Sequence, residues 1–289
     1  MASTIGVRVM DTSQDFQTAS AGDTVGRLAR DVRVAAIKMV AGAQASHIAG
    51  ALSMADLLAV LYSGILRVRP EDPDWSERDR FILSKGHSCA ALYAALALRN
   101  FIPMEELSSY GQDGSRLLAH VSHRVPGVEF STGSLGHGLP FGCGKALAAK
   151  RQGRNWRVFV MLSDGELDEG SNWEAILFAP QHRLDNLVAI VDYNKIQSLG
   201  TVSEVLELGP LADKFRAFRW AVREIDGHNH EEISAAMRNL PWESGQPSCL
   251  IAHTVKGKGV SFMENNLLWH YKSPDALQVQ QALRELGEG

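Results

Sequence analysis

The sequence of 289 residues has few cysteines and no long apolar run. Its three cysteines are widely spaced and form neither a Cys-x-x-Cys pair nor a dense disulfide pattern, which indicates a reducing environment. No stretch approaches the roughly eighteen apolar residues of a membrane span, and residues 1–21 lack the apolar centre of a signal peptide. We therefore expect a cytoplasmic protein with no membrane partner.

An excess of positive charge is also missing. Lysine and arginine number 29 against 33 aspartate and glutamate residues, so the formal net charge is −4 and we expect no nucleic-acid partner. The run Lys256-Gly257-Lys258-Gly259 is basic and glycine-rich, but it does not have the residue order of a nucleotide-binding P-loop. No Gly-x-Gly-x-x-Gly follows the first expected strand, which argues against a nicotinamide dinucleotide.

What the sequence does contain is an alternation of apolar strands and helices, with 45% hydrophobic residues to build a core. Buried strands are predicted at 80–84, 156–162, 187–191, 220–225 and 248–255. Helices are predicted at 23–43, 54–66, 89–99, 103–110, 138–150, from 171 onward, 211–218 and 231–240. We expect one doubly wound α/β domain over residues 23–289, with a mostly parallel sheet and helices on both faces, after an N-terminal arm of residues 1–22.

Local signals refine two of these helices. Ser53 is typical of an N-cap for the helix that begins at Met54. Ser171 and Glu174 fit a capping box, which predicts a helix start at Ser171. Pro180 should kink that second helix or end it early.

Polar side chains follow two neighbouring strands at their expected carboxyl ends. Ser163-Asp164-Gly165 follows one apolar run, and Asp192-Tyr193-Asn194 follows the next. Open α/β sheets bind ligands at this edge, and parallel neighbours would bring Asp164 and Asn194 together. A carboxylate, an amide oxygen and a nearby main-chain carbonyl suit Mg²⁺ or Ca²⁺ that also holds a phosphate. An ordinary strand-end turn is the alternative that this spacing leaves open.

Other turns carry polar residues as well. They stand after helices and strands or in the glycine-rich connection 111–139: His47, Lys85, His87, His120, His123, His137 and Lys256. Glycine permits a ligand to approach the backbone closely in such a connection. Taken singly, each of these side chains is more often structural than functional.

The combination of these segments closely resembles the thiamine diphosphate motif of transketolases. The motif reads Asp164-Gly165-Glu166-Leu167-Asp168-Glu169-Gly170, Trp173-Glu174-Ala175, Leu184-Asp185-Asn186-Leu187 and Asp192-Tyr193-Asn194-Lys195-Ile196-Gln197. Further similar segments are 46–47, 83–87, 126–129, 131–136, 226–228, 256–259 and 269–270. The resemblance extends over roughly residues 25–275 and implies the diphosphate domain of the thiamine diphosphate-binding fold.

By this resemblance the chain binds thiamine diphosphate with Mg²⁺, Ca²⁺ or Mn²⁺. Asp164, Asn194 and the main-chain oxygen of Ile196 would hold the cation, and Gly165 would let the diphosphate approach the backbone. The other residues that match cofactor-contacting positions are Lys85, His87, Gly133, Leu135, Lys256 and His270. Glu169 matches a catalytic carboxylate that links two cofactor sites across a subunit interface.

The resemblance also assigns proton transfers and contacts with sugar hydroxyls to histidines, whose pKa lies near neutrality. His47, His120 and His270 match these positions, and His87 joins them at the mouth of the active site. His123 competes with His120, because the local spacing is one residue short. The sequence departs from the family pattern at Ser163, Ile48-Ala49 and His137. These departures bear on the substrate preference and leave the cofactor assignment unchanged.

A whole transketolase resembles this sequence only in its first half, and the pyrimidine-binding half has no counterpart before Gly289. The resemblance therefore implies the N-terminal subunit of a split transketolase, completed by a separate C-terminal pyrimidine-domain subunit in an α2β2 assembly. Such an enzyme transfers a two-carbon ketol unit from a ketose or its phosphate to an aldose or its phosphate. Two alternatives stay open, a subunit of a deoxyxylulose-phosphate-synthase-like carboligase and a non-catalytic cofactor-binding subunit.

Overall fold

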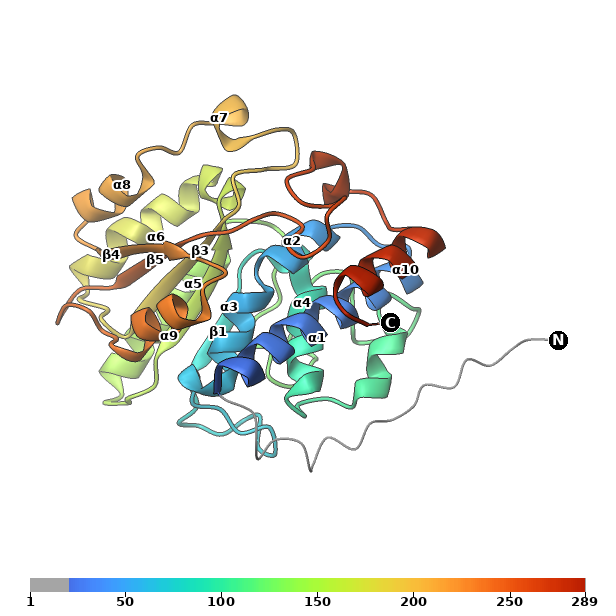
Figure 1. Ribbon diagram of the computed structural model, residues 1–289. Coiled ribbons are helices and arrows are strands. Elements are labelled where there is room, and N and C mark those ends of the chain that lie inside the picture. Colours follow the sequence, from blue (N-terminus) through green and yellow to red (C-terminus); the bar gives the residue numbers. More distant parts are fainter. Residues whose placement is uncertain (1–20, 289) are drawn as a thin grey trace.

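Five parallel strands form the centre of the computed structural model, which describes residues 21–288 (Figure 1). They lie in the order β1-β2-β3-β5-β4, and every neighbouring pair is parallel. The strands are β1 (Arg80–Leu83), β2 (Val158–Ser163), β3 (Leu187–Tyr193), β4 (Ala221–Asp226) and β5 (Ser248–His253). The predicted fold class is confirmed, and each predicted strand is present.

The strands divide their side chains between two hydrophobic cores, because successive side chains of a strand point to opposite faces. In β2, Phe159 and Met161 belong to one core, whereas Val158, Val160 and Leu162 belong to the other. Strands β3 and β5 alternate in the same way. Both faces of the sheet are therefore buried, which explains why the strands read as continuous apolar runs.

Helices cover both faces of the sheet (Figure 1). The core with Phe159 is shared with α1, α2, α3, α4 and α9, and the core with Val160 is shared with α5, α6 and α8. The helices are α1 (Ala21–Gly42), α2 (Ile48–Ser53), α3 (Ala55–Val60), α4 (Cys89–Leu98), α5 (Gly138–Arg151), α6 (Gly170–Gln181), α7 (Val202–Val205), α8 (Leu211–Ala217), α9 (His230–Arg238) and α10 (Ala276–Glu285).

Two predicted helix starts are wrong. Ser53 is the last residue of α2, and its hydroxyl donates to Asp192 at 2.6 Å while lying 3.0 Å from the Gly50 carbonyl oxygen. Helix α6 begins at Gly170, and the Ser171 hydroxyl donates to the Gly136 carbonyl at 2.7 Å. In both cases a distant partner uses the side chain that a local cap would need.

Other boundaries differ in smaller ways. The segment expected as one helix over 54–66 consists of α3 and a π-helical turn, Leu61–Ile65, while the segment 103–110 holds a 3-10 helix, Met104–Ser109. Helix α6 ends one residue after Pro180, as predicted. Helix α10 was not predicted, although it is amphipathic, begins with a capping box at Asp275, and packs against α1.

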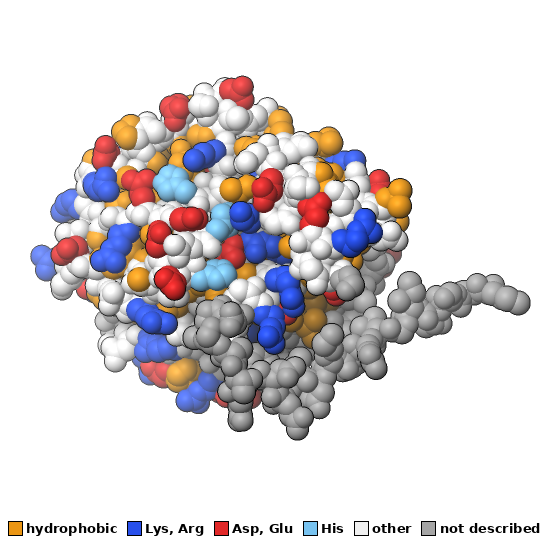
Figure 2. Space-filling view, in the orientation of Figure 1, with side chains coloured by type: hydrophobic (Ala, Val, Ile, Leu, Met, Phe, Trp, Pro, Cys, Tyr) orange, Lys and Arg blue, Asp and Glu red, His pale blue; other side chains and the backbone are white. Residues whose placement is uncertain are grey.

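The expected N-terminal arm, residues 1–22, lies outside the described residues except for Ala21 and Gly22, which already belong to α1. In the described range 21–288, no helix has both the length and the apolar character needed to cross a membrane. Basic and acidic side chains are interspersed over the face shown in Figure 2, with histidines among them.

Candidate active site

A pocket of about 250 Å³ lies at the carboxyl ends of β2, β3 and β5, beside the turn that follows β1. Every predicted site residue except Glu169 lines it: His47, Lys85, His87, His120, Gly133, Leu135, Asp164, Gly165, Asn194, Ile196, Lys256 and His270. Parallel strands deliver these residues to one edge of the sheet, as the sequence predicts.

The expected cation ligands lie together because β2 and β3 are hydrogen-bonded neighbours. Asp164 accepts hydrogen bonds from the main-chain N–H groups of Gly165 at 2.8 Å and Lys195 at 2.5 Å. The Asn194 side-chain oxygen accepts from the Ile196 N–H at 3.2 Å. The set comprises a carboxylate, an amide oxygen and a main-chain carbonyl, which are the hard oxygen ligands that Mg²⁺ and Ca²⁺ prefer.

Asp164 is a buried carboxylate with too little positive charge beside it. Burial raises its pKa to about 6, and the charge of Asp192 adds to the rise. Within residues 21–288, Asp164 has no ion-pair partner, whereas Asp192 is paired with Lys85. No group of three or more His, Cys, Asp and Glu side chains in this range could hold a metal. A cation at Asp164 would therefore rely on the amide and carbonyl oxygens as further ligands.

Lys85, which lines the pocket, is held in place by an ion pair with Asp192. Its ammonium lies 2.5 Å from the Asp192 carboxylate and donates to the Gly50 carbonyl at 3.0 Å. Ser53 and Thr254 also donate to Asp192. Burial would raise the pKa of Asp192, but the Lys85 charge and these hydrogen bonds hold it below its usual value.

Lys256 supplies the second ammonium of the pocket. Its Nζ donates to the Ile196 carbonyl at 2.7 Å and lies 2.9 Å from His270 Nδ1. Burial, together with the charge of Lys85, lowers the pKa of Lys256 to about 8. The negative charge of Asp164 acts in the opposite direction and raises it. Two lysines, Lys85 and Lys256, thus line the pocket.

Four histidines also line the pocket: His47, His87, His120 and His270. The His47 ring centre lies 5.0 Å from those of His87 and His270 and 6.2 Å from that of His120. His47 has a left-handed backbone (φ 69°), which is uncommon outside glycine, and its N–H donates to the His270 carbonyl at 2.9 Å. His47 Nδ1 is buried without a hydrogen-bond partner in the described structure, so one polar atom of this cluster is open to a ligand.

His47, His87 and His270 are held neutral by their surroundings. Burial, together with nearby positive groups such as Lys256, lowers the pKa of His47 to about 4 and that of His270 to about 3. Burial and Lys85 lower the pKa of His87 well below its usual value. At neutral pH these imidazoles are uncharged, so each has a ring nitrogen of the kind that accepts a hydrogen bond from a hydroxyl.

Glycines keep the backbone bare at two points of the pocket. A Cβ at Gly165 would lie 2.9 Å from Gln197 Cγ, and a Cβ at Gly133 would lie 3.1 Å from His120 Cδ2. Side chains at these positions would collide with their neighbours, whereas glycine leaves main-chain groups accessible.

The structure separates the two histidines that the spacing left in competition. His120 lines the pocket, whereas His123 is exposed and hydrogen-bonds to Ser131 at 2.7 Å. Glu169 is exposed, precedes α6 and does not line the pocket. Its predicted role across a subunit interface therefore stays a prediction.

A comparison with protein families decides what kind of pocket this is. The family described as "Transketolase, thiamine diphosphate binding domain" matches residues 25–288. The chain belongs to this transketolase family. The resemblance drawn from the sequence motif is thereby confirmed.

Relatives of this transketolase-family chain include subunits of about its own length. One subunit of the apulose-4-phosphate transketolase of Phocaeicola vulgatus is 44% identical over 252 residues, which cover 87% of this chain and 90% of that relative. A 6-deoxy-6-sulfo-D-fructose transketolase subunit of Clostridium sp. is 44% identical over 225 residues, 78% of this chain and 82% of the relative. The solved transketolase of Campylobacter jejuni matches with a TM-score of 0.87 and 31% identity, covering 92% of this chain and 43% of that chain.

Several pocket residues of this transketolase-family chain were not predicted from the sequence. They are Gly50, Ser163, Gln197, Ser198 and Tyr271. Two buried carboxylates, Asp192 and Glu166, were also not predicted as part of the site. Glu166 accepts from the Gly136 N–H at 2.9 Å and from the Ser84 hydroxyl, so it joins two loops of the pocket. The available signal was an acidic residue inside or beside a buried strand, which needs a partner.

The depressed histidine pKa values predict a pH dependence of stability. An unfolded histidine titrates near 6.5, whereas folded His47 titrates at about 4. The unfolded state therefore binds more protons between these values, and this contribution to the free energy of unfolding is present above pH 6.5 and lost as pH falls toward 4. Urea unfolding should show that His47→Gln loses less stability than wild type between pH 7.5 and pH 5.5.

Asp164, whose pKa is raised to about 6, makes the folded state more stable as pH falls below 6, opposite to the effect of His47. The test therefore compares the pH dependence of the variants with one another and does not interpret the wild-type slope alone. His123→Gln is the matched control, because His123 is exposed and lies outside the pocket. Equal pH slopes for the His47 and His123 variants would contradict the prediction.

Proposed function

We propose that this chain is the diphosphate-binding subunit of a transketolase-type enzyme, which binds thiamine diphosphate with a divalent cation and transfers a two-carbon ketol unit between sugars. The observation that carries the proposal is that one pocket gathers Asp164, Asn194 and Ile196 with two lysines and four histidines. Its family membership makes thiamine diphosphate the cofactor expected there.

The residues present fit an anionic cofactor with a cation. Asp164 has no ion-pair partner in the described chain, and burial together with the charge of Asp192 raises its pKa, so a cation beside it would be favourable. Lys256 has a pKa lowered to about 8 and three histidines have depressed pKa values, so additional negative charge would be favourable on that side. A cation held by Asp164, Asn194 and Ile196 and a diphosphate beside Lys256 and the bare backbone at Gly165 satisfy both requirements.

Thiamine diphosphate, when bound, supplies the electron sink that cleavage of a carbon–carbon bond beside a carbonyl needs. The chain's own residues bind, orient and move protons. His47 and His270, with His87 and His120 beside them, hydrogen-bond to substrate hydroxyls and assist their proton transfers. Lys85 and Asp192 hold the floor of the pocket in place from below.

We propose further that the site is completed by a separate pyrimidine-domain subunit in an α2β2 assembly. The similarity to a relative that is itself named as one subunit of a transketolase, over 90% of that relative's length, supports a partner chain. Substrates of the relatives named above carry a phosphate or a sulfonate, so we propose a ketose with an anionic group as the donor of this enzyme.

The partner requirement predicts a large difference in activity. With thiamine diphosphate and Mg²⁺, the chain alone should transfer ketol units at least roughly 10³-fold more slowly than the chain combined with its pyrimidine-domain partner, because groups that act as one unit fail together when one is removed. The assay compares ketose phosphates, ketose sulfonates and pyruvate as donors.

Mixing with the pyrimidine-domain subunit of an unrelated thiamine diphosphate enzyme provides the control. Full ketol transfer by the isolated chain would contradict the partner requirement. Preference for pyruvate over every ketose would instead favour the carboligase alternative.

A further inference from the structure

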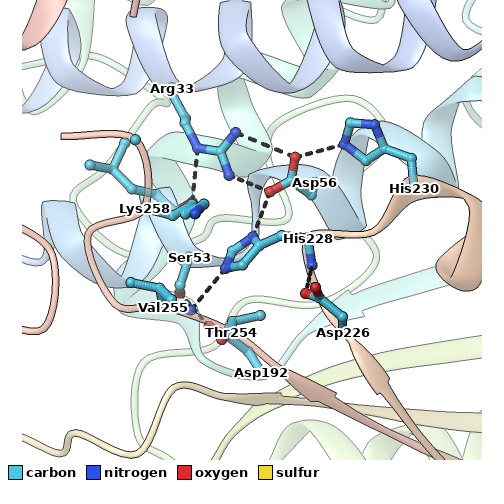
Figure 3. A network of polar contacts seen from close by, with 12 residues as sticks. Arg33, Ser53, Asp56, Asp192, Asp226, His228, His230, Thr254, Val255 and Lys258 are labelled. Carbon is cyan, nitrogen blue, oxygen red and sulfur yellow. Dashed lines mark hydrogen bonds and ion pairs between the residues drawn. The ribbon is translucent and has the colours of Figure 1, made fainter. Parts of the chain in front are cut away.

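A buried aspartate lies behind the pocket, in contact with two histidines and an arginine (Figure 3). Asp56 of α3 is 4% exposed. Its carboxylate lies 2.7 Å from His228 Nδ1 and 2.7 Å from His230 Nε2, and Arg33 of α1 donates to it as well. Burial would raise the pKa of Asp56, but the two histidines and Arg33 hold it well below its usual value, so Asp56 is ionised.

The hydrogen bonds of His228 determine which of its ring nitrogens carries the proton. Its Nε2 accepts from the main-chain N–H of Val255 at 2.8 Å. An amide N–H can only donate, so Nε2 is unprotonated and Nδ1–H donates to Asp56. The Asp56 carboxylate therefore fixes both the tautomer and the orientation of the His228 ring.

Val255 lies just after β5 and directly precedes Lys256, whose ammonium lines the pocket. The main chain here is held on both sides of Val255: the Thr254 hydroxyl donates to Asp192, and the Gly257 N–H donates to the Ala49 carbonyl at 2.9 Å. Between them, the Val255 N–H donates to the His228 ring.

We propose that Asp56 and His228 are positioning residues, which hold the main chain at Val255 so that the Lys256 ammonium reaches the pocket beside Ile196 and His270. This inference rests on the proposed function in one respect, namely that Lys256 contacts the diphosphate of the cofactor in the pocket. Asp56 and His228 act through Val255, and neither residue lines the pocket.

His230 offers a matched control within the same network. It contacts the other oxygen of the Asp56 carboxylate at the same distance, 2.7 Å, but among the described residues it hydrogen-bonds to neither Val255 nor the pocket lining. A purely structural role of the network predicts similar effects for His228 and His230. A positioning role predicts an effect on cofactor binding for His228 alone.

The test uses His228→Asn, His228→Gln and His230→Gln in the full chain assembled with its partner. Asparagine can place an amide near Nδ1 and keep the Asp56 contact, but it leaves the Val255 N–H without an acceptor. Glutamine can place an oxygen near Nε2 and keep that acceptor. Hydrogen exchange of the Val255 amide and the Kd for thiamine diphosphate in the presence of Mg²⁺ are measured for each variant.

We expect His228→Asn to increase exchange at Val255 and to raise the Kd by roughly 10- to 100-fold, the usual cost of removing a residue that orients a ligand-binding group. His228→Gln should restore most of both properties, and His230→Gln should bind the cofactor like wild type while losing some thermal stability.

Equal Kd values for His228→Asn and wild type, or equal losses in His228→Asn and His230→Gln, would overturn the positioning role. If the wild-type assembly bound no thiamine diphosphate at all, the proposed function would fail instead. Exchange at Val255 tests the His228 contact independently of that outcome, and an unchanged rate in His228→Asn would refute it.

Discussion

Asp164→Ala should reduce ketol transfer by roughly 10³-fold or more, because it removes the charged ligand of the proposed cation site. A loss of about 4 kcal/mol is of the size measured when one partner of a buried charge interaction is deleted, and it corresponds to a factor of about 10³ in binding. The main measurement is cofactor binding, as the Kd for thiamine diphosphate with and without Mg²⁺. The variant should lose the Mg²⁺ dependence that wild type shows.

The ligand-free stability of Asp164→Ala separates this effect from misfolding. In the folded chain the pKa of Asp164 is raised to about 6, above the unfolded value near 3.9, so its ionised form at pH 7 works against folding. The ligand-free variant should therefore lose little stability in urea, because relief of the buried charge offsets the loss of the hydrogen bonds from Gly165 and Lys195.

Asp168→Ala is the matched control for this substitution. Asp168 ends the 3-10 segment Gly165–Asp168, whose N-cap is Asp164, and it does not line the pocket. Its removal should therefore weaken Mg²⁺-dependent cofactor binding far less than Asp164→Ala does. Normal Mg²⁺-dependent binding by Asp164→Ala would contradict the cation site. That result would instead favour a pocket that binds its ligand without a cation at Asp164, or a subunit without a catalytic role.

Lys85→Ala should lower the free energy of unfolding by about 3–5 kcal/mol, because it leaves Asp192 as an unpaired charge in the interior. Lys85 is 1% exposed and Asp192 is 0% exposed, and their charged atoms lie 2.5 Å apart. Ser53 and Thr254 can still donate to Asp192, but neither carries a charge. Urea unfolding at pH 7 measures the loss.

The double variant Lys85→Met/Asp192→Asn tests the cause of that loss. Removing both charges should restore part of the stability, because burying neutral groups costs much less than burying one unpaired charge. A third variant, Lys38→Ala, removes a lysine from an exposed ion pair with Glu288 and should change stability by less than about 1 kcal/mol. A Lys85→Ala loss as small as that of Lys38→Ala would contradict the buried pair.

Local sequence patterns were sufficient for the strands and for the residues at their ends. Strand β2 is an unbroken apolar run followed by Asp164, and β3 is followed by Asn194; because parallel strands end at the same edge, both were correctly expected in one place. The motif around them was long enough to indicate the family, which the family comparison confirms.

Capping signals and single histidines were less informative, because they depend on what lies nearby in space. Ser53 and Ser171 are good cap residues by type, yet each donates to a residue far away in the sequence. Spacing alone could not choose between His120 and His123, which lie three residues apart and face different surroundings.

The sequence by itself determined the fold class, the family and the ligand-bearing strand ends, since these depend on periodicity and on a contiguous motif. Only the tertiary structure decided which charges compensate one another. Lys85 meets Asp192, Asp56 meets His228, and Asp164 remains without a cationic partner among the described residues. Such pairings are set by strand order and helix packing, which bring together residues that are distant in the chain, and no local pattern records them.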